Sequence, residues 1–151
     1  MILALDIGGT KIAVGTVSNK GVVVSRETFA TPASGGKVVI NAIVAAIARH
    51  KTPKTKAIGL AIAGQIDSVL GVVRSSPNLK LTKIPLHSII TRKFRLPVAI
   101  ENDACCFTIG EAVYGAGRGH KSVFGVTIGT GIGGGIVLEK KVFRGATDSA
   151  S

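Results

Sequence analysis

Aromatic residues, cysteine and acidic residues are all scarce in this 151-residue chain, which has no tryptophan, one tyrosine and five phenylalanines. These few rings do not form the aromatic platform of an RNA-binding sheet, and no zinc finger or DNA-recognition helix pattern is present. No apolar run reaches the length of a membrane span. We therefore predict no membrane partner and do not expect a nucleic acid partner.

The only two cysteines, Cys105 and Cys106, are adjacent in the sequence. Neighbouring cysteines rarely bridge each other, and two cannot build a disulfide framework or a zinc site. The first six residues also lack the basic start and cleavage site of a signal peptide. Together these features predict buried thiols in a reducing environment and hence a cytoplasmic protein.

Positive charge is in excess, with 19 Lys and Arg against 8 Asp and Glu and a net charge of +11. Such an excess attracts phosphorylated ligands. The basic residues are scattered along the chain, which favours a solvated basic surface or an acidic partner segment outside it. Apolar residues make up 46% of the sequence, so we expect a globular domain with a real core.

The first seventeen residues carry the most informative pattern. Residues 2–7 are apolar apart from Asp6, which predicts a strand covered on both faces, and residues 11–17 continue as a second strand. Backbone N–H groups in the glycine turn between them form a concavity for anions. The candidate phosphate contacts are Gly8, Gly9, Thr10 and Lys11, and Asp6 is a candidate Mg²⁺ ligand, directly or through water. An ordinary hairpin with a glycine turn would explain the same residues.

The rest of the chain alternates between strand and helix patterns. Further strands are expected at 22–28, 57–63, 97–100 and 122–128, and helices at 39–47, 85–94 and 103–114. This order predicts an α/β fold whose mixed sheet of about five strands, the first three antiparallel, is flanked by helices. Glycine-rich residues 115–119 suggest a boundary between a first lobe at 1–116 and the start of a second at 117–151.

A second glycine turn, residues 129–135, follows the strand at 122–128. Its candidate phosphate contacts are Gly129, Thr130 and Gly131, so that two turns would hold one polyphosphate from opposite sides. Between them in the chain, Asp103 follows a core strand and is placed to accept a proton from an alcohol attacking phosphorus. Capping of the following helix by Asn102 or Asp103 is the simpler interpretation of that pair taken alone.

Six motifs in order resemble the ROK family of repressors, open reading frames and sugar kinases. They are Leu5–Lys11, Ala63–Asp67, Pro77–Leu79, Glu101–Ala104, Gly115–Gly119 and Thr127–Gly135. The resemblance implies an actin-like ATPase, ribonuclease H-like fold and ATP-dependent phosphorylation of a hexose or N-acylhexosamine, in a homodimer using ATP and Mg²⁺. It also implies that Asp103 is the catalytic base and that Gly64, Asn78 and Asn102 line the sugar.

The chain departs from the family pattern in three places. Cys105 and Cys106 follow Ala104 where the family usually has a further asparagine and small residues, and residues 80–84 replace a common Pro-Gly-Trp. The family's sugar-binding Glu and His, zinc ligands and adenosine pocket would all lie after Ser151, so the family zinc site is absent from this chain. The resemblance therefore implies the amino-terminal half of a glucokinase-like enzyme, inactive alone, whose residues 121–151 are disordered, pair with a second copy or fold back on the first lobe.

Two other functions remain open. One is the sugar-sensing part of a ROK repressor; because the first strand begins at Ile2, no DNA-binding segment is expected before it. The other is a stand-alone module that binds phosphorylated ligands weakly through the basic charge and the glycine turns.

Overall fold

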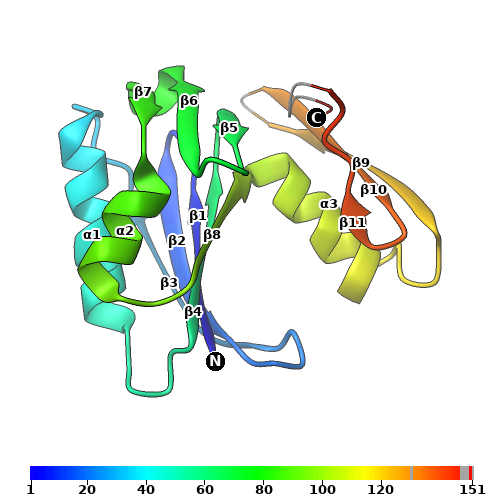
Figure 1. The fold of residues 1–151 in the computed structure, drawn as a ribbon, viewed down its shortest axis with the longest axis horizontal. Helices are drawn as coiled ribbons and strands as arrows, with labels where there is room; N and C mark the ends of the chain where they lie inside the picture. The colour runs from blue at the N-terminus through cyan, green and yellow to red at the C-terminus, as the bar shows by residue number, and fades with distance from the viewer. Residues whose placement is uncertain (130, 147–149, 151) are drawn as a thin grey trace. The chain divides into compact units, whose positions relative to one another are not determined.

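The computed structural model describes residues 1–129, 131–146 and 150. They form two compact units, unit 1 at Met1–Glu101 and unit 2 at Asn102–Ser151 (Figure 1). This division falls before the expected boundary at 116/117, because helix α3 (Asp103–Tyr114) packs on strands β9 and β10 of unit 2. The two-lobe division of a whole protein stays a prediction. No helix among the described residues is both long and apolar enough to cross a membrane.

Unit 1 is built on a five-stranded mixed sheet with the order β3-β2-β1-β4-β8. Its strands are β1 (Ile2–Ile7), β2 (Lys11–Val17), β3 (Val23–Ala30), β4 (Ala57–Ile62) and β8 (Val98–Asn102). The first three are antiparallel neighbours, and β4 runs parallel to β1, with Ile7 opposite Ile62. The expected sheet is therefore confirmed, and the ends of β1 and β4 lie side by side.

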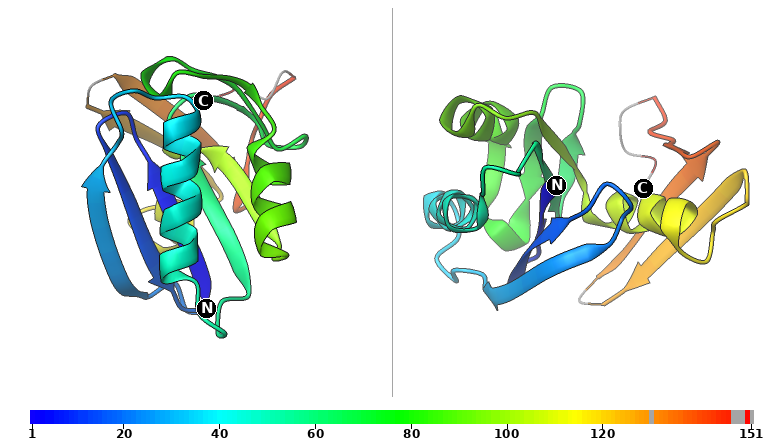
Figure 2. Two further views of the ribbon diagram at one scale, coloured as in Figure 1. Left: turned by 90° about the vertical axis from the view of Figure 1, so that its left-hand side faces the viewer. Right: turned by 90° about the horizontal axis from the view of Figure 1, so that it is seen from below.

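Helices α1 (Lys37–His50) and α2 (Leu86–Phe94) cover the same face of this sheet, as Figure 2 shows from the helix side. Apolar side chains at helical spacing place one stripe of α1 on the strands. The core contains Leu3, Leu5, Ile7, Ile12, Val39, Ile43, Ile47 and Ile90, each at most 2% exposed. At the end of α1, Arg49 and His50 both bond the Glu27 carboxylate on edge strand β3, over 2.6 and 2.8 Å.

A second sheet of unit 1 was not expected from the sequence. Its order is β5-β6-β7, formed by β5 (Gln65–Asp67), β6 (Val72–Ser76) and β7 (Leu81–Ile84), with the 3₁₀ turn η1 (Pro77–Leu79) between the last two. Ile66, Val73 and Leu81 are at most 3% exposed and belong to the core of unit 1, which is why these short strands form.

Unit 2 combines α3 with a three-stranded antiparallel sheet of order β11-β10-β9. Its strands are β9 (Ser122–Ile128), β10 (Ile132–Leu138) and β11 (Lys141–Val142). Of the three alternatives expected for residues 121–151, disorder does not hold for residues 122–142, because this sheet packs on α3. The expected long glycine loop is also shorter, since Gly133, Gly134 and Gly135 belong to β10.

Glycines allow this close packing of sheet and helix. Gly125 and Gly135 are opposite each other on β9 and β10, and both face Thr108, which is fully buried on α3. A Cβ added to Gly135 would lie 2.7 Å from Thr108 Oγ1, and one added to Gly125 would collide with the same hydroxyl. That hydroxyl donates to the main-chain oxygen of Ala104 over 2.8 Å. Residues without a Cβ are therefore needed where the sheet meets α3.

We expect Gly125→Ala to destabilise unit 2 by about 1–3 kcal/mol, because the new methyl group overpacks the contact with Thr108. Gly110→Ala is the matched control: a Cβ there meets nothing within 4 Å, and alanine favours α3 by up to about 1 kcal/mol. Urea denaturation followed by circular dichroism measures both. Equal stability of the two variants would contradict the packing described here.

Candidate active site

The first glycine turn is held rigidly in unit 1. The Gly8 N–H donates to the Lys11 carbonyl over 3.0 Å, which closes the turn between β1 and β2. Thr31, just after β3, donates its hydroxyl to the Gly8 carbonyl over 2.7 Å and its N–H to the Thr10 carbonyl over 3.0 Å. Gly9, Thr10 and Lys11 are exposed. The turn therefore presents a hydroxyl and an ammonium group from a fixed backbone.

Two of the predicted sugar-binding residues lie at the same end of the unit 1 sheet. The Ala63 N–H donates to the Ile7 carbonyl over 3.1 Å, so Gly64 begins beside the first turn. Asn78 in η1 lies against that turn, because a Cβ added to Gly9 would be 2.8 Å from Asn78 Cβ. Unit 1 thus brings together the glycine turn, Gly64 and Asn78, where the parallel strands β1 and β4 end.

Gly64 has a local reason to be glycine. Its φ of 139° is a backbone conformation that side chains disfavour, and an added Cβ would lie 2.9 Å from Ser76 Cβ. The buried Ser76 hydroxyl donates to the Ala63 carbonyl over 2.5 Å and ties β6 to the end of β4. Neither Ser76 nor Thr31 was anticipated from the sequence. Each acts through a long-range bond to a main-chain oxygen that no local pattern signals.

In unit 2, Asn102 and Asp103 form a small hydrogen-bonded network where β8 passes into α3. Asn102 is the N-cap, since its Oδ1 accepts from the Cys105 N–H over 3.0 Å. Asp103 Oδ1 accepts from the Asn102 side-chain amide and from the Ala104 N–H, both over 3.0 Å. Among the described residues, Asp103 Oδ2 has no hydrogen bond. One carboxylate oxygen is therefore anchored and the other is left able to accept a proton.

The second glycine turn lies at the same end of unit 2 as Asp103. A Cβ added to Gly133, just after the turn, would be 3.1 Å from Ala104 Cβ, so the first turn of α3 lies against β10. The Gly129 N–H donates to the Gly131 carbonyl over 2.9 Å. Both glycines are exposed, and a Cβ on either would meet nothing within 4 Å. Thr130, the third predicted contact, lies outside the described residues.

Asp6 is the residue that the sequence predicts as a Mg²⁺ ligand. It is exposed near the end of β1, on the sheet face opposite the buried Leu5 and Ile7. Within the residues that the structure describes, no group of three or more His, Cys, Asp and Glu could hold a metal. Mg²⁺ carried by a polyphosphate keeps its waters and takes only one or two protein carboxylates. A single exposed carboxylate such as that of Asp6 is compatible with this requirement.

Asp67 has a structural role in this part of unit 1. Its Oδ1 accepts from the Leu70 N–H over 2.9 Å and its Oδ2 from Arg74 over 2.7 Å, which closes the β5–β6 hairpin. These contacts, first the Leu70 bond and then the Arg74 bond, hold the pKa of Asp67 below its ordinary value of 3.8. The ionised carboxylate therefore stabilises the fold above the unfolded-state pKa, and the effect is lost as pH falls through the folded-state pKa.

We expect Asp67→Asn to be less stable than the parent at pH 7. The difference in stability should persist to about pH 5 and shrink once the pH falls below the ordinary pKa of 3.8. Urea denaturation at a series of pH values measures the two midpoints. Glu139→Gln is the control, because Glu139 is exposed and its ion pair with Lys121 is 4.0 Å long. A difference for Asp67→Asn that stays constant down to pH 3 would contradict the role of the ionised carboxylate.

The mixed sheet and the strand–glycine turn–strand units define an actin-like ATPase fold, the fold of the sugar kinases that this structure matches. The ROK family model matches residues 2–150, and the chain belongs to the ROK family. The chain is 35% identical to a glucokinase of Streptomyces coelicolor over 146 residues, which cover 96% of this chain and 46% of that enzyme. It thus spans about half the length of the relatives it matches.

Two further matches bear on function. A ROK family glucokinase from Streptomyces griseus, solved in complex with glucose and AMPPNP, superposes with a TM-score of 0.86 at 38% identity, covering 95% of this chain and 46% of that one. A xylose repressor of Caldicellulosiruptor bescii is 39% identical over 101 residues, 66% of this chain and 25% of the repressor. The match to the glucokinases extends over more of the chain.

Proposed function

We propose that this chain is the amino-terminal lobe of an ATP-dependent hexose kinase that transfers the γ-phosphate of ATP to a sugar hydroxyl. The observation that carries the proposal is the Asp103 carboxylate, with Oδ1 held by two N–H donors and Oδ2 without a hydrogen bond among the described residues. A carboxylate positioned in this way takes the proton of the attacking hydroxyl as the oxygen–phosphorus bond forms. The similarity to glucokinases supports glucose as the first sugar to test.

The other predicted residues bind and orient in this proposal. Both glycine turns bind phosphate oxygens. The first turn does so through its N–H groups, Thr10 and Lys11, and the second through Gly129, Thr130 and Gly131. Gly64, Asn78 and Asn102 contact the sugar, and Asp6 would hold Mg²⁺, which would neutralise charge on the phosphates when bound. Phosphoryl transfer depends mainly on such positioning and charge compensation. A homodimer, a cytoplasmic location and the lack of a nucleic acid partner stay predictions.

A chimera tests the proposal. Residues 1–151 would replace the matching half of the Streptomyces coelicolor glucokinase, and glucose phosphorylation by ATP would be measured with a coupled assay. We expect the chimera to phosphorylate glucose and the 151-residue chain alone to show no turnover. N-acetylglucosamine would be the second sugar tested in the same assay. A folded chimera that binds glucose and ATP but does not turn over would contradict the proposal.

Sugar sensing in a repressor is the second candidate, and the match to the xylose repressor favours it. That match covers 66% of the chain, against 96% for the glucokinase. A sensor also has no need of a carboxylate prepared to accept a proton. Sugar-dependent retardation of operator DNA by the full-length protein, without hexokinase activity, would favour the repressor.

A further inference from the structure

The loop at residues 31–36, between β3 and α1, is hydrogen-bonded to both parts of the candidate site in unit 1. At its start, Thr31 donates its hydroxyl and its N–H to two main-chain oxygens of the first glycine turn, over 2.7 and 3.0 Å. At its end, the Gly36 N–H donates to the Leu79 carbonyl in η1 over 2.8 Å. The loop therefore joins the glycine turn to the 3₁₀ turn that carries Asn78.

The loop is compact and fits closely against η1. The Gly35 N–H donates to the Pro32 carbonyl over 3.0 Å, which closes a turn within the loop. Gly35 is buried with a φ of 67°, which side chains disfavour, and an added Cβ would lie 2.9 Å from the Leu79 carbonyl oxygen. On the outside, Lys80 Nζ donates to the Ala33 carbonyl over 3.3 Å. These contacts fix the distance that the loop spans.

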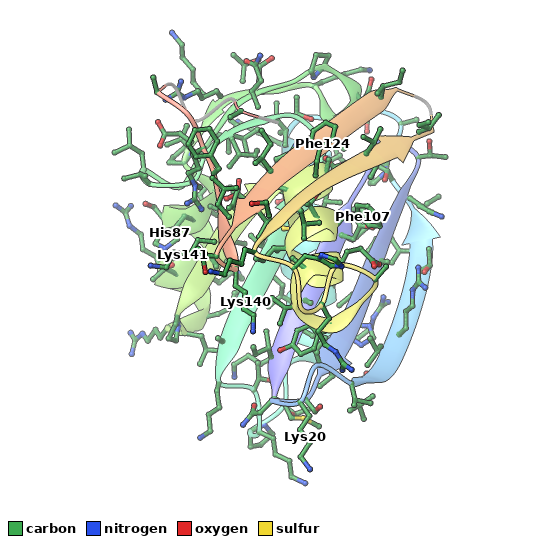
Figure 3. All side chains as sticks on the ribbon, turned by 90° about the vertical axis from the view of Figure 1, so that its right-hand side faces the viewer. Lys20, His87, Phe107, Phe124, Lys140 and Lys141 are labelled. Carbon is green, nitrogen blue, oxygen red and sulfur yellow. The ribbon has the colours of Figure 1, made fainter. Side chains whose placement is uncertain are left out.

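A direct contact between the two turns completes a ring. Gly9 lies against Asn78, since a Cβ added to Gly9 would be 2.8 Å from Asn78 Cβ. The Leu79 side chain is fully buried in the core of unit 1, which anchors η1, whereas Asn78 is exposed and able to meet a ligand. The ring lies at the end of the sheet opposite the β2–β3 hairpin, whose exposed Lys20 is labelled in Figure 3.

We propose that Thr31 is a positioning residue, which sets through the loop where Asn78 lies relative to the first glycine turn. The inference rests on the proposed function, in which the turn binds phosphate and Asn78 binds the sugar. A misplacement of about 1 Å between reacting groups can cost about 10²-fold in rate. In this role Thr31 contacts neither substrate and acts on the rate by holding the two turns in a fixed arrangement.

Nuclear magnetic resonance of the 151-residue chain tests the connection without catalysis. Thr31→Val keeps the shape of the side chain and removes its hydroxyl. We expect this variant to shift the amide signals of both the glycine turn and η1, and to speed hydrogen exchange of the Gly36 N–H by about tenfold or more. Thr31→Ser keeps the hydroxyl and should match the parent. Thr28→Val, at an exposed position of β3, is the matched control and should change neither turn.

The signals of η1 decide the result. If they stay in place in Thr31→Val, the inference is overturned, because Thr31 would at most support the glycine turn alone. Movement of both turns in Thr28→Val as well would also overturn it, since the effect would then not be specific to the Thr31 hydroxyl.

Kinetics of the chimera test the consequence for the reaction. Thr31→Val should lower kcat about tenfold while KM for glucose and ATP changes far less, because the reactants still bind but are misplaced. Thr31→Ser should recover most of the lost kcat. A lower melting temperature with unchanged kcat per folded molecule would show a merely structural role and overturn the inference. A parent chimera without activity would count against the proposed function alone, and the resonance measurements would then decide whether Thr31 connects the two turns.

Discussion

Replacing Asp103 by asparagine should reduce turnover of the chimera by about 10²- to 10⁴-fold, the range that a positioned general base contributes. The asparagine carbonyl oxygen can still accept from the Asn102 side chain and the Ala104 N–H, as Asp103 Oδ1 does. The substitution therefore removes the proton-accepting oxygen and keeps the anchored one. A coupled assay at saturating glucose and ATP measures kcat, and we expect KM for glucose to change far less.

The control for this prediction is another acid of unit 2. Glu139→Gln removes an exposed carboxylate in the turn after β10, and its turnover should equal that of the parent chimera. Both variants should melt at the parent temperature, because neither change removes a buried contact. Near-normal turnover of Asp103→Asn would exclude Asp103 as the base. The capping role would then be sufficient to explain the Asn102–Asp103 pair.

Long, periodic elements could be predicted from the sequence because their signals are local. The apolar run at 2–7, the glycine turn after it and the helical spacing of Val39, Ile43 and Ile47 each determine their own structure. Strands β5 and β7 could not be predicted, because three or four residues carry too little periodicity. They form because Ile66 and Leu81 complete a core built from distant parts of unit 1.

The glycines of β10 show a second limit of local reasoning. Gly133, Gly134 and Gly135 follow a glycine turn and suggest a continuing loop, yet they form a strand. The cause is α3, since Cβ atoms added to Gly135 and Gly133 would lie only 2.7 Å from Thr108 Oγ1 and 3.1 Å from Ala104 Cβ. Similarly, the residue types at the candidate site were recognisable, whereas the supports from Thr31 and Ser76 depend on contacts 23 and 13 residues away.

Gly9→Ala should lower kcat/KM of the chimera by about 10- to 100-fold, equivalent to roughly 1.4–2.7 kcal/mol of transition-state stabilisation. The new Cβ would lie 2.8 Å from Asn78 Cβ, and so the turn and η1 must move apart. Since we propose that the turn binds phosphate and Asn78 binds sugar, KM should rise for both ATP and glucose. Gly59→Ala on β4 is the control, because a Cβ there meets nothing within 4 Å.

A second substitution separates the two possible causes of this effect. Asn78→Gly removes the Cβ that the new methyl group would meet, and in that background Gly9→Ala should cost little further activity, because residues in contact are not additive. Steady-state kinetics of the two single variants and the double variant give the coupling directly. The double variant could instead lose activity by the product of the two single-variant factors. Gly9 would then act on the phosphates alone, and its contact with Asn78 would have no role in catalysis.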